Sequence, residues 1–244
     1  MSRWKASSLY LLMCVIVACT VLACMLLVWF PWPLFKITGG SQLALILVSV
    51  DMVLGPLLVL IVYREGKKSL KFDLAVIALL QLSALAYGIY SISLARPVYI
   101  VFTVDRFDIV TAKDLDPADL AEVRRPEFQS QPWGRPRYIG VKSPSDPAQR
   151  EKVMMSSMAG KDLQMFPQYY EPYSALAADA LKRARPIASI RPRAPAILDD
   201  YLATSRRSED SVRYLPLRAS KQDAAVIVDA KTGDPLKILL VDPW

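Results

Sequence analysis

The chain has 244 residues, of which 53% are hydrophobic, and a formal net charge of +7. It contains no histidine, which excludes Ser-His-Asp triads and His-based zinc sites, and its three cysteines, Cys14, Cys19 and Cys24, all lie in the first apolar stretch. No Gly-rich nucleotide motif and no GxSxG sequence is present, so we expect no catalytic residue, metal site or cofactor and do not expect an enzyme.

Three apolar stretches, at residues 9–30, 43–63 and 74–95, dominate the first part of the chain. Each is close to the roughly 20 residues that a helix needs to cross a bilayer. We therefore predict a membrane protein with three transmembrane α-helices in residues 1–96, followed by a small α+β periplasmic domain in residues 97–244.

The first stretch has two other interpretations. A cleavable signal peptide has an apolar region of about 7–15 residues, which is shorter than this one. A lipoprotein signal is the second, because residues 16–19 have the apolar-small-Cys form of a lipobox. Further apolar residues follow Cys19 where a lipoprotein continues into a polar tether, so we expect an uncut helix.

Basic residues flank the apolar stretches unevenly. Arg3 and Lys5 precede the first stretch, four basic residues lie in 64–71, and the connection after the first stretch has only Lys36. By the positive-inside rule, the amino terminus and the second connection face the cytoplasm. We therefore expect a bacterial inner membrane protein whose last domain is periplasmic.

Asp51 is the most costly residue in the membrane, because an ionisable group at the bilayer centre costs about 2.5–3.5 kcal/mol. Gly55 lies on the same helical face, and Pro56 cannot donate to the carbonyl of Met52. By the helical rise, Gln81 lies at a similar depth in the third helix. In that helix Ala84 and Gly88 form a small-xxx-small step that permits close helix approach.

Three roles for Asp51 remain open at this stage. Its carboxyl group is protonated and hydrogen-bonded within the bundle, for example to Gln81, or it receives a polar group from a partner's transmembrane helix. Ion or proton translocation is the third, although no internal repeat typical of transporters is visible. The candidate partner-binding residues are Asp51, Gly55, Pro56, Gln81, Ala84 and Gly88.

The last domain is expected to have four or five strands and two or three helices. Predicted strands lie at 98–104, 107–111 and near 212–217, a hairpin at 224–229 and 236–241, helices at 147–159 and 172–184, and a loop at 124–147. Asp146 is the predicted N-cap of the first helix. The acidic groups at 105–108, 114–119 and 199–200 are expected to be solvated surface pairs.

Arginines in residues 183–193 are interleaved with prolines. A solvated connector is one interpretation; a surface for anionic lipid headgroups or an acidic partner is another. Nucleic acid is not expected as a partner, because this segment lies outside the cytoplasm in the predicted topology.

Four longer blocks, residues 1–7, 46–57, 70–81 and 96–107, and two shorter ones, 159–162 and 169–173, share one likeness. Together they resemble the type IV pilin accessory proteins of the TfpX/TfpZ kind, and the likeness covers the whole chain. None of the blocks is a catalytic signature.

The resemblance implies an inner-membrane accessory protein that promotes pilin stability or pilus assembly without being a pilus subunit. The implied partners are the lipid bilayer, the major pilin and the inner-membrane assembly machinery. We expect a pilin-specific chaperone or adaptor. The alternatives are a membrane-anchored periplasmic sensor and a pilin-modifying factor.

Overall fold

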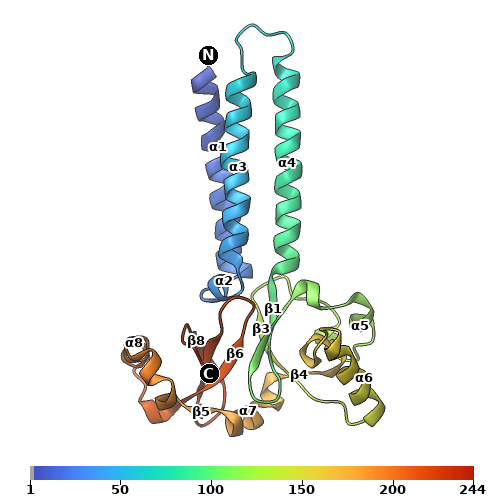
Figure 1. The fold of residues 1–244 in the computed structure, drawn as a ribbon, viewed down its shortest axis with the longest axis vertical. Coiled ribbons are helices and arrows are strands. Elements are labelled where there is room, and N and C mark those ends of the chain that lie inside the picture. The colour runs from blue at the N-terminus through green and yellow to red at the C-terminus, as the bar shows by residue number, and fades with distance from the viewer. Residues whose placement is uncertain (1–2) are drawn as a thin grey trace.

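Three long helices occupy the first part of the computed structural model, which describes residues 3–244 (Figure 1). They are α1 (Arg3–Cys24, continued by a π-helical turn at Met25–Trp29), α3 (Gly40–Val62) and α4 (Leu70–Ala95). Each is long and apolar enough to cross a membrane, which confirms the three predicted spans. Met1 and Ser2, the start of the first resemblance block, lie outside the described residues.

Helix α3 lies between α1 and α4 (Figure 1). The connection from α3 to α4 and the start of α1 lie together at one end of the three helices, and the remainder of the chain lies at the other end. This arrangement is the one that three consecutive spans require. A short helix, α2 (Leu34–Ile37), joins α1 to α3 at the second end.

Residues 97–244, here called the head domain, are built on one mixed sheet of eight strands. Seven of them follow the order β4-β3-β1-β2-β6-β7-β8, and β5 pairs with β6 off this path. The strands are β1 (Pro97–Phe102), β2 (Phe107–Thr111), β3 (Arg137–Val141), β4 (Tyr170–Pro172), β5 (Arg185–Pro186), β6 (Val212–Arg218), β7 (Ala224–Asp229) and β8 (Pro235–Leu239). The helices are α5 (Pro117–Ala121), α6 (Pro147–Met158), α7 (Ala177–Arg183) and α8 (Pro195–Ser205).

The structure confirms the strands near 98, 107 and 212, the hairpin β7–β8, and Asp146 as the N-cap of α6. The predicted loop at 124–147 is wrong in its last part, because β3 pairs in parallel with β1 there. Helix α8 was not expected, and the predicted helix at 172–184 begins only at Ala177. Strand β3 is five residues long and follows a Pro-rich stretch, so its partner, distant in sequence, decides its conformation.

Side chains from both faces of the sheet are buried. In β1, Ile100 and Phe102 belong to one hydrophobic core and Tyr99 and Val101 to a second, because successive strand residues point to opposite faces. Helix α7 contributes to the first core. Helix α8 contributes to a third, over alternate residues of β6 and β7. The sheet is therefore the middle layer of the head domain.

The head domain is attached to the membrane helices at two places. Helix α4 ends at Ala95 and β1 begins at Pro97, so a single residue separates them. Leu34 and Ile37 of α2 are buried in the first core of the head domain. The backbone N–H of Lys221 donates to the carbonyl of Ile37 at 3.0 Å, which ties α2 to the connection between β6 and β7.

A loop of the head domain forms a further contact with the end of α1. The indole Nε1 of Trp29 donates to the carbonyl of Trp133 at 3.2 Å, and Arg135 Nε donates to the carbonyl of Leu27 at 3.0 Å. The Arg96 guanidinium lies 4.5 Å from the ring centre of Trp133. These polar contacts hold the 129–136 loop against the membrane helices.

Asp108 departs from the surface location expected for it. It is 2% exposed and pairs with Arg106 Nε at 3.3 Å and Arg218 Nε at 3.2 Å. Burial raises the pKa of its carboxyl group, and the two arginines act in the opposite direction. The partner arginine on β6 is distant in sequence, which is why the local pattern indicated a solvated acid.

Gly233 in the turn between β7 and β8 has φ of +77°, and a Cβ there would lie 2.5 Å from the carbonyl oxygen of Ala177. We expect Gly233→Ala to lower the free energy of unfolding by at least about 1–2 kcal/mol, the cost of the left-handed conformation alone. The measurement is thermal unfolding of the detergent-solubilised protein. Gly134→Ala is the control, since a Cβ at Gly134 meets no atom within 4 Å. Equal melting temperatures for the two variants would contradict this prediction.

Candidate partner-binding site

Several of the buried residues of α1 and α3 have small side chains. Ala6, Cys14 and Ala18 are buried on α1, and Gly55 is buried on α3. In a membrane such residues let helix backbones approach closely, because water does not drive apolar helices together there. The Ser7 hydroxyl adds a hydrogen bond to the carbonyl of Pro56 at 2.9 Å.

Gln81 connects all three membrane helices. The Tyr10 hydroxyl on α1 donates to Gln81 Oε1 on α4, and Gln81 Nε2 donates to the backbone carbonyl of Asp51 on α3 at 3.4 Å. Gly55 provides the space, since a Cβ at this position would overlap the Gln81 amide. The amide of Gln81 is therefore paired at both its oxygen and its nitrogen.

The Asp51 carboxylate lies beside this cluster but outside its hydrogen bonds. The residue is 7% exposed, and nothing in residues 3–244 donates a hydrogen bond to the carboxylate or forms a salt bridge with it. The expected hydrogen bond between the Asp51 carboxyl group and Gln81 is not formed among these residues; Gln81 bonds to the backbone carbonyl of Asp51 instead. A buried polar group left without a partner costs about 1–3 kcal/mol or more. The carboxylate is thus available to a donor from another molecule.

Asp51 lines two cavities. The first, of about 230 Å³, lies between α1 and α4 and is lined by Tyr10, Met13, Cys14, Val17, Asp51, Ala78, Gln81, Leu82 and Leu85. The second, of about 280 Å³, lies between α3 and α4, and its lining includes Asp51, Ala84, Tyr87 and Gly88. Both are bordered mainly by apolar side chains, and Asp51 is the one Asp, Glu, Lys or Arg residue in either lining.

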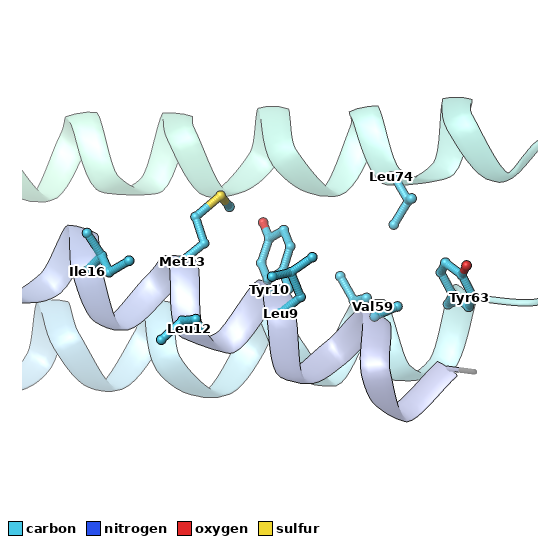
Figure 2. A pocket seen from close by; sticks show the side chains of 9 residues that line it. Leu9, Tyr10, Leu12, Met13, Ile16, Val59, Tyr63 and Leu74 are labelled. Atoms are coloured by element: carbon cyan, nitrogen blue, oxygen red, sulfur yellow. The ribbon is translucent and has the colours of Figure 1, made fainter. Parts of the chain in front are cut away.

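A third cavity, of about 470 Å³, continues the first toward the end of the helices that lies away from the head domain (Figure 2). Tyr10 and Met13 line both cavities and point from α1 toward α4. The remaining walls are apolar side chains of the three helices, among them Leu9, Val59 and Leu74. We call the first and third cavities together the Asp51 groove.

The structure separates the six predicted site residues into three groups. Asp51 and Gln81 line the Asp51 groove, and Ala84 and Gly88 meet Asp51 at the second cavity. Gly55 and Pro56 are buried and line none of these cavities; their contacts are with Gln81 and with Ser7 inside the bundle. A Cβ at Gly88 would overlap Leu47 of α3, so this glycine also serves the packing of α3 against α4.

Tyr10 is the site residue that the sequence reasoning missed. The available signal was a phenol hydroxyl within an apolar span, since such a group needs a hydrogen-bond partner inside a membrane. Ser83, which lies near Gln81 in sequence, donates instead to the carbonyl of Leu79 in its own helix at 2.8 Å.

Within residues 3–244, no three His, Cys, Asp or Glu side chains gather closely enough to hold a metal ion.

The chain is similar to three fimbrial assembly proteins of Dichelobacter nodosus. The serogroup I protein is 31% identical over 186 residues, which cover 75% of this chain and 72% of the relative. The serogroup E1 protein is 28% identical over 232 residues, covering 92% and 90% respectively, and the protein of serogroups C1 and C2 is 36% identical over 113 residues, covering 46% and 86%. No family model and no solved structure matches the chain.

The link between Tyr10 and Gln81 predicts a measurable coupling between α1 and α4. Tyr10→Phe removes a hydrogen bond within the membrane, so we expect the free energy of unfolding to fall by about 0.6 kcal/mol, and to fall by less when the same change is made in a Gln81→Leu background, where the partner is already absent. The measurement is a double-mutant cycle on the protein unfolded in mixed detergent micelles. Tyr87→Phe is the control, because Tyr87 is 73% exposed on α4. Additive effects of the two changes would show that the link carries no energy.

Proposed function

The chain belongs to the family of fimbrial assembly proteins, and we propose that in pilus biogenesis it is a chaperone or adaptor for the pilin subunit. We place it with the type IV pilin accessory proteins of the TfpX/TfpZ kind. It binds the pilin before assembly and keeps it in a state that the assembly machinery accepts. The family relationship of the chain and the Asp51 groove support this proposal.

The shape of the client explains why the protein has two parts. A pilin awaiting assembly is a single apolar membrane helix that carries a globular head. A protein that holds such a client needs one surface within the bilayer and a second outside it. The three membrane helices and the head domain supply surfaces at both levels.

The observation that carries the proposal is the unpaired carboxylate of Asp51 in an apolar groove. Lipid chains cannot donate a hydrogen bond to it, whereas a polar side chain on a neighbouring helix can. A pilin helix in the Asp51 groove would supply that donor and cover the apolar walls beside it. Asp51 also lines the second cavity, together with Ala84 and Gly88. A partner helix in either cavity would therefore meet the carboxylate.

The proposal includes a location and a mode of action. The protein resides in the bacterial inner membrane with its amino terminus in the cytoplasm and its head domain in the periplasm, as the distribution of basic residues predicts. It acts by binding rather than as an enzyme. Its partners are pilin, the inner-membrane assembly machinery and the lipid bilayer, and nucleic acid is not among them.

Deletion of the gene tests the role directly. Cells without this protein should have less pilin and few or no surface pili, and pilin should co-purify with a tagged copy from detergent extracts. Immunoblotting of pilin and electron microscopy of the cells give the two readouts. Normal piliation together with the absence of pilin from the tagged protein would contradict the proposal.

Substitutions at Asp51 test the groove. Asp51→Leu should leave the protein folded, because it removes a buried unpaired carboxylate, but should reduce the pilin recovered by about three- to twentyfold, as the loss of about 0.6–1.7 kcal/mol implies. Asp51→Asn keeps an acceptor oxygen and should have a smaller effect. Ser83→Ala is the control, since its hydroxyl bonds only within α4. Unchanged pilin abundance and pilus number in both Asp51 variants would exclude this role for the groove.

A further inference from the structure

Strand β8 ends the sheet and has one edge without a partner. It pairs with β7 on one side, and no strand in the described part of the chain pairs with its other side. Backbone N–H and C=O groups on such an edge are ready to pair with another extended chain. Edge strands often carry lysine or proline that discourages this pairing, and β8 contains both Pro235 and Lys237.

Lys237 is exposed, and its side chain reaches an aromatic ring on α8. Its ammonium group lies 5.8 Å from the ring centre of Tyr201 on α8, across the space beside β8. Pro235 is the first residue of the strand, so the residues that follow it keep their N–H groups. The edge of β8 is therefore open to pairing beyond its first residue.

A cavity of about 600 Å³ runs along this edge. Its lining includes residues 236–240, one after another. Consecutive strand residues point to opposite faces of a sheet, so a cavity that touches all of them lies along the edge rather than over one face. Residues 31–34, at the membrane end of the head domain, also line it, as do Ile100 of β1 and Tyr138 of β3.

Helix α8 forms the opposite wall. Ile197 and Tyr201 line the same cavity as β8, and Tyr201, Thr204 and Ser205 line an adjoining one of about 280 Å³ together with Leu236 and Lys237. These positions recur with the spacing of one helical face. We call the space between β8 and α8 the β8 groove. A strand beside a helix is the geometry that binds an extended peptide by strand addition.

The charges along the β8 groove favour an acidic occupant. Arg135 and Lys237 line it, and neither forms a salt bridge within residues 3–244. Asp200 is the one carboxylate in the wall of the larger cavity. Arg207, in the adjoining cavity, is already paired with Asp229 at 2.7 Å.

We infer that the β8 groove binds an extended, acidic segment of the pilin head, which adds to the sheet as a strand beside β8. This inference rests on the proposed function and names the second contact that it requires. Residues 31–34 line the groove and belong to the connection between two membrane helices, so the bound segment lies near the membrane surface, where the pilin helix joins its head. Main-chain hydrogen bonds to β8 supply affinity, and Arg135 and Lys237 select the acidic segment.

Site-specific photo-crosslinking in cells with the full-length protein tests the inference. A crosslinker at Thr204, on the groove face of α8, should capture pilin, and the same group at Ala203, which lines neither cavity of the groove, should not. Thr204→Trp should reduce the pilin recovered with the tagged protein severalfold, and Ala203→Trp should leave it unchanged. Because both positions are exposed on the same helix, any general effect on folding appears in both variants.

Charge and hydrogen exchange add two readouts specific to this mode of binding. Lys237→Glu should weaken pilin recovery severalfold, and Lys231→Glu, the same change in the exposed turn of the same hairpin, should not. In the purified complex, amide exchange over residues 236–240 should slow when pilin binds, because strand addition pairs backbone N–H groups.

The outcomes separate this inference from the proposed function. If pilin co-purifies and pili form, but pilin is not captured at Thr204 and exchange in β8 is unchanged, the inference is overturned and the proposed function stands. Capture of a second copy of this chain at Thr204, or of lipid, also overturns it. If pilin is recovered under no condition, the proposed function itself fails.

Discussion

Burial of α2 in the head domain is the contact on which the arrangement of the whole molecule depends. Leu34 and Ile37 come from the connection between two membrane helices, yet both are buried among strands of the sheet. Full burial of such a side chain is worth about 1.5–3 kcal/mol, and the direct passage from α4 into β1 adds a second attachment. The Asp51 groove and the β8 groove are consequently parts of one body, at two fixed depths.

Within the described residues, the polar cluster at the centre of the membrane helices is paired, and the Asp51 carboxylate beside it is not. Tyr10, Gln81 and the backbone of Asp51 pair with one another across three helices, as a medium without water requires. The Asp51 carboxylate has no such partner within the described residues. Departures from the rule of full pairing concentrate at functional positions, because a binding site must keep a group free for its ligand. The cost of Asp51 is therefore the physical argument for a partner helix.

Features of the fold that depend on neighbouring residues were predicted correctly from the sequence, and features that depend on residues distant in the chain were missed. The three spans, the N-cap Asp146 and the β7–β8 hairpin depend on neighbouring residues, and the structure confirms them. Strand β3 and helix α8 were missed because their partners are distant in sequence. For the site, the sequence indicated Asp51 and Gln81 at similar depth, but it could not show that Gln81 binds the backbone or that Tyr10 completes the cluster.

By itself, the sequence determined that the chain crosses a membrane three times and that one carboxylate lies among the apolar residues, because the length and polarity of a span are properties of consecutive residues. Tertiary structure alone decided which groups that carboxylate meets, which face of each helix borders a groove, and which strand is left at the edge of the sheet. These features depend on the relative placement of segments far apart along the chain, and no periodicity within a single segment encodes that placement.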